Sequence, residues 1–141
     1  MMALREGGRD ADGAPILRIG LPRTPEAPSV ARAAVAGFFE RRAIQPETLS
    51  TLRLLVSELV SNAVLHSDAP SSSDIQLHVR VLDETAVRVE VIDQGAGFTP
   101  QPQSGVPYGG GYGLYLVQKQ ATHWGVDKND GTRVWFELPS Q

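Results

Sequence analysis

Residues 46–66 read PETLSTLRLLVSELVSNAVLH. Apolar side chains recur in this stretch every three or four positions, which is the spacing of one face of an α-helix. The residues that fall in one broad apolar stripe are Leu49, Leu52, Val56, Leu59, Val60 and Ala63. The pattern predicts a helix from about Pro46 to about His66 that packs on the core through this stripe.

Glu58 and Asn62 lie at the edge of the stripe, about 40° apart around the predicted helix. They can therefore line a cleft beside the core. The carboxylate could polarise water or a substrate hydroxyl, and the amide oxygen could bind Mg²⁺, which prefers oxygen ligands and keeps waters and phosphates as partners. The plain alternative is an exposed Glu and an Asn that only hydrogen-bonds nearby. His66, two turns after Glu58, is more simply a packing residue.

The segments on either side of this helix predict a sheet and two more helices. Apolar residues alternate with polar ones, the period of a strand, over 16–21, 74–82, 87–93, 124–128 and 132–138. Helical patterns cover 24–43 and 114–122. The expected fold class is α+β: a two-layer α/β sandwich, with a mixed, mostly antiparallel sheet and about three helices on one face.

Composition limits the function classes. The chain of 141 residues has a net charge of -3, so charge gives no reason to expect nucleic acid as a partner. The absence of cysteine excludes disulfides and thiolate metal sites. Residues 1–15 lack periodicity and predict a disordered tail before a domain at 16–139. No stretch approaches a membrane span in length and no signal peptide is evident, so we expect a cytoplasmic protein without a membrane partner.

Two further segments contain residues that could contact a ligand. Asp93, at the end of a predicted strand and followed by Gly95 and Gly97, could accept a hydrogen bond from an amine such as that of adenine, or could simply belong to a turn. The glycine run at 109–113 leads into a predicted helix, so its amides and the helix dipole could hold phosphate. Thr132 is either a plain strand residue or a second contact near the base. The spacing fits neither a dinucleotide fingerprint nor a P-loop.

Three segments together resemble the N, G1 and G2 boxes of the GHKL ATPases: SELVSNAVLH at 57–66, VIDQGAGF at 91–98 and GGGYGLYL at 109–116. The resemblance covers roughly 16–139. The ending GTRVWFELP at 131–139 is similar to the last strand of the small bacterial branch that contains the anti-sigma-factor serine kinases.

The resemblance implies roles for individual residues. Glu58 would be the catalytic base that orients the attacking hydroxyl, Asn62 the magnesium ligand and Asp93 the adenine contact. Residues 98–112 would form a mobile ATP lid. The remaining cofactor-binding residues would be Gly95 and Gly97 beside the base, Gly109, Gly110, Gly111, Tyr112, Gly113 and Leu114 around the phosphates, and Thr132 at the adenine edge.

The resemblance also implies an activity: an ATP- and Mg²⁺-dependent serine/threonine protein kinase that phosphorylates a small anti-anti-sigma-type regulator and sequesters a sigma factor. Relatives of this kind are often dimers, so a homodimer is a further expectation. The alternative is a non-catalytic ATP-binding module whose nucleotide state sets partner binding. It stays open because Tyr112 stands where many relatives have arginine, and no Lys or Arg lies between Arg88 and Lys119 to stabilise a transferring phosphoryl group.

Overall fold

The computed structural model describes residues 4–9, 13–66, 73–83, 85–94, 112–128 and 131–140. Over these residues the chain forms the following elements in order: β1 Leu4–Arg9, β2 Pro15–Leu21, α1 Ala27–Phe38, α2 Pro46–His66, β3 Ile75–Leu82, β4 Ala86–Asp93, α3 Tyr112–Gln120, β5 His123–Asp127 and β6 Thr132–Pro139.

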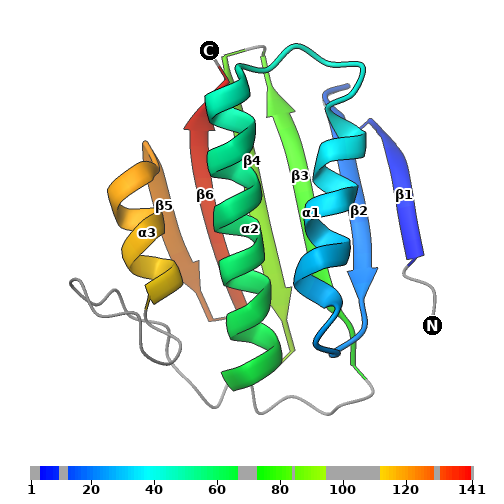
Figure 1. The fold of residues 1–141 in the computed structure, drawn as a ribbon, viewed down its shortest axis with the longest axis vertical. Coiled ribbons are helices and arrows are strands. Elements are labelled where there is room, and N and C mark those ends of the chain that lie inside the picture. Colours follow the sequence, from blue (N-terminus) through cyan, green and yellow to red (C-terminus); the bar gives the residue numbers. More distant parts are fainter. Residues whose placement is uncertain are drawn as a thin grey trace.

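The strands form one six-stranded sheet in the order β1-β2-β3-β4-β6-β5. Every described pair of neighbours is antiparallel. The three helices cover one face of this sheet, with α1 in front of the β2 side, α2 across the middle and α3 in front of β5 (Figure 1). The expected two-layer α+β sandwich is confirmed, and the described strands contain no parallel pairing.

The core lies between the helices and the sheet. Every second side chain is buried along the whole of β4 and along β3 from Ile75 to Val79, as the alternating pattern predicts. The largest side chain that is fully buried belongs to Phe136 of β6. The α2 residues Leu52, Leu55, Val56 and Val60 are also fully buried. Each such side chain stabilises the fold by about 1.5–3 kcal/mol relative to an exposed one, so this interface is what holds α2 in place.

Helix α2 has the predicted bounds, but it corrects one expectation. Over Pro46–Leu65 it is long and apolar enough, by length and composition, to cross a membrane. The expectation that no stretch approaches that length is therefore wrong. In the structure the apolar stripe of α2 packs on the sheet and on α1.

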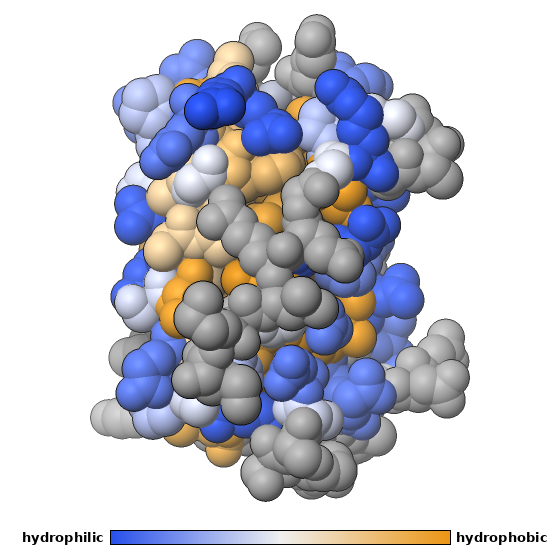
Figure 2. Space-filling model, turned by 90° about the vertical axis from the view of Figure 1, so that its right-hand side faces the viewer, coloured by the Kyte–Doolittle hydropathy of each residue, from blue (hydrophilic) through white to orange (hydrophobic). Residues whose placement is uncertain are grey.

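The expectation of a disordered tail at residues 1–15 is wrong for Leu4–Arg9, which form β1. This strand pairs with β2 from Leu4 opposite Gly20 to Arg9 opposite Pro15. Strand pairing uses backbone N–H and C=O groups at the free edge of β2, so it needs no alternation of apolar side chains. Figure 2 views the molecule from this edge, where hydrophilic residues at the top and bottom border apolar surface near the middle.

The two shorter helices start and stop at other residues than expected. Helix α1 begins at Ala27, where the cap residue Glu26 makes no side-chain hydrogen bond, and it ends at Phe38 rather than near residue 43. Nη1 of Arg42 donates to the carbonyl oxygen of Phe38 at 2.6 Å, which satisfies a helix-end acceptor from outside the helix. Helix α3 begins two residues earlier than expected, at Tyr112, and ends at Gln120.

The sheet face opposite the helices carries polar side chains, among them His78 of β3. Burial lowers the pKa of His78 below its usual value of 6.5. The carboxylate of Glu90 opposes this shift, and the positive charges of Arg18 and Arg133 add to it. The neutral form of the imidazole is therefore favoured in the folded protein.

Candidate functional site

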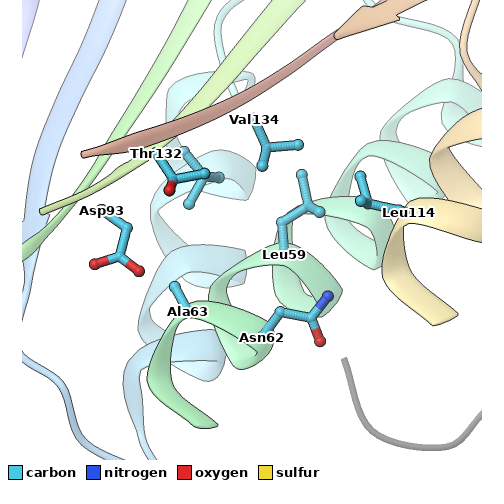
Figure 3. A pocket seen from close by; sticks show the side chains of 8 residues that line it. Leu59, Asn62, Ala63, Asp93, Leu114, Thr132 and Val134 are labelled. Atoms are coloured by element: carbon cyan, nitrogen blue, oxygen red, sulfur yellow. The ribbon is translucent and has the colours of Figure 1, made fainter. Parts of the chain in front are cut away.

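A pocket opens between α2, the ends of β4 and β6, and α3 (Figure 3). It encloses about 20 Å³, and about 340 Å³ when the adjoining space open to solvent is counted. The enclosed part has room for about one water molecule. The residues that line the pocket are Leu59, Asn62, Ala63, Val91, Asp93, Leu114, Thr132 and Val134.

One end of the pocket is polar. Asp93 and Thr132 are direct partners in the β4–β6 register, and both are buried. Gly131 brings them together: its φ is +119°, and a Cβ at this position would lie 2.3 Å from the carbonyl oxygen of Asp93. Only glycine allows the chain before β6 to come this close to the end of β4. A carboxylate and a hydroxyl therefore face the same small space.

The rest of the pocket wall is apolar. Leu59, Val91, Leu114 and Val134 are all buried and come from four different elements. Ligand pockets typically combine such a lining with a few polar groups that fix orientation. The arrangement suits a flat, largely apolar group whose hydrogen-bond donors are directed at Asp93.

Asn62 lies on the α2 side of the pocket, and Figure 3 shows its amide directed away from Asp93. No group of three or more His, Cys, Asp or Glu residues that could hold a metal ion occurs in the described part of the chain. A magnesium ion fits the amide oxygen of Asn62 only if phosphate and water supply most of its ligands, which is the usual coordination of Mg²⁺ beside a nucleotide.

The other predicted site residues are not all brought to this pocket. Glu58 lies one turn before Asn62 on α2 and is partly exposed, and it does not line the pocket. Tyr112 and Gly113 begin α3, beside the pocket residue Leu114. The side chain of His66 and the whole of Gly95, Gly97, Gly109, Gly110 and Gly111, with the rest of the expected lid through residue 111, lie outside the described residues.

No sequence motif pointed to Arg23, a residue that contacts the site. Its Nη2 forms an ion pair with Oδ1 of Asp93, and the two side chains are only 7% and 5% exposed. Nη1 donates to the carbonyl oxygen of Ala63 at 3.1 Å, and Nε donates to Oγ of Ser73 at 3.3 Å. Arg23 and Asp93 are 70 positions apart, so no local pattern could have signalled the contact.

Comparison with known proteins places this geometry in a family. Residues 21–138 match the family described as the histidine kinase-like ATPase domain. The chain belongs to this family. The pocket thus lies in a histidine kinase-like ATPase domain, and Asn62, Asp93, Leu114 and Thr132 are the residues expected from the resemblance that the structure brings to its wall.

Among similar proteins of this family, the chain is 35% identical over 78 residues to an anti-sigma F factor of Pasteuria penetrans, which covers 55% of this chain and 52% of that protein. It is 29% identical over 133 residues to the serine-protein kinase RsbW of Bacillus pumilus, with 84% of this chain and 82% of that protein covered. The chain thus spans about half of the first of these relatives and most of the second.

Two solved structures have a similar fold. The crystal structure of the RsbU and RsbW domains of Rv1364c from Mycobacterium tuberculosis has a TM-score of 0.71 at 22% identity, covering 90% of this chain and 33% of that chain. The blue-light activated histidine kinase EL346 of Erythrobacter litoralis has a TM-score of 0.57 at 26% identity, covering 79% of this chain and 40% of that chain.

Proposed function

We propose that this chain is an ATP-dependent protein serine kinase of the anti-sigma type. It phosphorylates a small anti-anti-sigma-type regulator and sequesters a sigma factor. The observation that carries the proposal is the pocket of a histidine kinase-like ATPase domain in which Asp93 and Thr132 form one polar end and Asn62 lies on another side. Relatives named serine-protein kinase RsbW and anti-sigma F factor support the same assignment.

Different residues of the pocket would contact different parts of the adenine base of ATP. The Asp93 carboxylate accepts a hydrogen bond from the adenine amine, and the Thr132 hydroxyl lies beside it at the base edge. The buried side chains of Leu59 and Val134 contact the faces of the base. Because the enclosed space is small, the base also occupies the part of the pocket that is open to solvent.

The phosphate end involves other groups. Asn62 would hold Mg²⁺ through its amide oxygen, and by the resemblance the glycines of the 109–113 run would supply backbone amides to the phosphates. ATP would be the phosphoryl donor, and a bound Mg²⁺ would supply charge neutralisation for the transferred group. Glu58, one turn from Asn62 on the same helix, orients the attacking serine hydroxyl. By the resemblance, residues 98–112 would form the lid and Gly95 and Gly97 would lie beside the base; residues 95–111 are outside the described part of the chain.

The proposal extends to the setting of the reaction. The kinase acts in the cytoplasm on soluble partners, as suits a regulator of transcription factors, and it works as a homodimer. Relatives named anti-sigma F factor and serine-protein kinase RsbW support a sigma factor and a protein substrate as the partners.

Two measurements test the proposal. Calorimetry with ATP, ADP and GTP, with and without Mg²⁺, should show binding of both adenine nucleotides and weaker binding of GTP. Asn62→Ala should remove the Mg²⁺-dependent part of the ATP affinity, whereas Ser61→Ala, at the neighbouring position on α2, serves as the control. Incubation with labelled ATP and the cognate regulator should then label a serine. Absence of transfer to the correct partner would end the kinase assignment.

A second candidate is a regulatory module that binds ATP without transferring phosphate. One observation favours it: no Lys or Arg lies between Arg88 and Lys119. The resemblance to the GHKL ATPases implies an arginine in that interval, at the place of Tyr112. The transition state would then lack the cation that commonly stabilises it. This candidate predicts ATP affinity without a phosphoprotein, and loss of partner binding in Asp93→Ala.

A further inference from the structure

We propose that Arg23 is a positioning residue for purine recognition. It holds the Asp93 carboxylate from outside the pocket, so that the carboxylate presents an acceptor to the amine of adenine. This inference rests on the proposed adenine contact of Asp93. It adds a residue outside the three sequence segments that resemble the nucleotide-binding boxes.

The guanidinium of Arg23 is buried and uses all three of its nitrogens. Nη2 pairs with Asp93 at the end of β4, Nη1 bonds the Ala63 carbonyl oxygen in the last turn of α2, and Nε bonds the Ser73 hydroxyl just before β3. A guanidinium is a planar donor with fixed angles between its N–H groups. Contacts to three separate segments therefore leave Asp93 little freedom to turn.

The segment that carries Arg23 is itself constrained. Pro22 and Pro25 fix the backbone on either side of the pair Arg23-Thr24, because proline restricts its own φ. The amide of Thr24 donates to the carbonyl oxygen of Pro22 at 2.8 Å, and the amide of Ala27 donates to that of Thr24 at 3.0 Å. The turn between β2 and α1 thus holds the backbone of Arg23 in place.

The direction of the contact decides its role. Asp93 lines the pocket and Arg23 does not, so Arg23 reaches the carboxylate from the side that a ligand does not occupy. Figure 3 shows the two carboxylate oxygens of Asp93 directed to different sides. Arginine can only donate hydrogen bonds, and an ionised carboxylate can only accept them. An acceptor presented to the pocket matches the amine of adenine and opposes the carbonyl oxygen of guanine.

Arg23 also fixes where Asp93 lies relative to Asn62. The Ala63 carbonyl that accepts from Nη1 belongs to the residue directly after Asn62 on α2. The same guanidinium thereby links the strand end that contacts the base to the helix turn that carries the proposed magnesium ligand. The Arg23 guanidinium would then help to fix both the carboxylate that selects the base and the helix turn that carries the metal ligand.

Calorimetric titration of ATP and GTP into the wild-type chain and its variants tests this role. Arg23→Gln removes the cation and should lower ATP affinity by about 10- to 100-fold, the usual effect of losing a hydrogen bond to a charged group. GTP affinity should change little, so the ATP-to-GTP ratio should fall. Arg23→Lys keeps the charge but not the planar fork and should give an intermediate ratio. Arg18→Gln, an exposed arginine of β2, is the matched control and should keep the wild-type ratio.

Several results would overturn the inference. One is a folded Arg23→Gln variant with the wild-type ratio, and another is a variant with raised ATP affinity, which would make Arg23 a competitor of the base. If thermal unfolding shows that Arg23→Gln does not fold, Arg23→Lys decides, and a wild-type ratio there refutes the role. Failure of the wild-type chain to bind ATP would instead overturn the proposed function and this inference with it.

Discussion

The buried ion pair between Arg23 and Asp93 predicts that Asp93→Ala weakens the fold as well as nucleotide binding. The two side chains are 7% and 5% exposed. Removing one partner of a buried pair typically costs about 3–5 kcal/mol, because the other charge stays buried without compensation. Arg23 keeps its bonds to Ala63 and Ser73 in this variant, so we expect the lower end, about 3 kcal/mol. That is a large part of the stability of about 5–15 kcal/mol usual for a domain.

Urea unfolding followed by circular dichroism measures this loss. Asp127→Ala, at an exposed aspartate of β5, is the control and should lower the free energy of unfolding by less than about 0.5 kcal/mol. The double variant Arg23→Met with Asp93→Ala should regain part of the loss, because it no longer buries an unpaired cation. A loss below about 1 kcal/mol in Asp93→Ala, the range of exposed ion pairs, would refute the buried pair. So would a double variant whose loss equals the sum of the single losses.

Three further changes test other parts of the structure. Gly131→Ala places a Cβ 2.3 Å from the Asp93 carbonyl oxygen, at a φ of +119°. The free energy of unfolding should therefore fall by at least the cost of a strained backbone, about 1–3 kcal/mol. Unfolding in urea measures this loss, and wild-type stability would contradict the close approach of Gly131 to Asp93. Glu58→Gln should slow serine phosphorylation by about 10²- to 10⁴-fold while calorimetry shows unchanged ATP binding, and undiminished transfer would remove Glu58 from the mechanism. The pKa of His78 is lower in the folded protein than in the unfolded chain, so as the pH falls below 6.5 the imidazole takes up a proton in the unfolded chain before it does so in the folded protein. The contribution of His78 to the free energy of unfolding should therefore decrease below pH 6.5 and level off below the folded-state pKa. His78→Gln should flatten this dependence, His123→Gln is the control because its side chain is 68% exposed, and equal pH slopes in the wild-type chain and His78→Gln would contradict the effect of burial.

The sequence predicted those parts of the fold in which one pattern repeats several times. Helix α2 has the expected bounds because an apolar stripe from Leu49 to Ala63 runs through most of its 21 residues. Strands β3 and β4 follow from the alternation of apolar and polar residues along most of their length. Asn62, Asp93 and Thr132 could be singled out from short local segments, and the sheet register and helix packing bring them to one pocket.

Other features depend on contacts that a local pattern does not contain. Strand β1 has no apolar alternation and exists through backbone pairing with β2. Arg23 contacts Asp93 only because the β2–α1 connection folds against the end of β4. The role of Gly131 likewise depends on its closeness to Asp93, which the sequence pattern of a turn does not reveal. Contacts between residues far apart in the sequence become visible only in the tertiary structure.

The most direct test of the central claim is a crystal structure of the chain with ADP and Mg²⁺. We predict that the adenine ring lies between Leu59 and Val134, with its amine within hydrogen-bond distance of the Asp93 carboxylate and the metal on Asn62. A structure in which the nucleotide binds elsewhere, or in which the pocket stays closed by its own side chains at saturating ADP, would contradict the account.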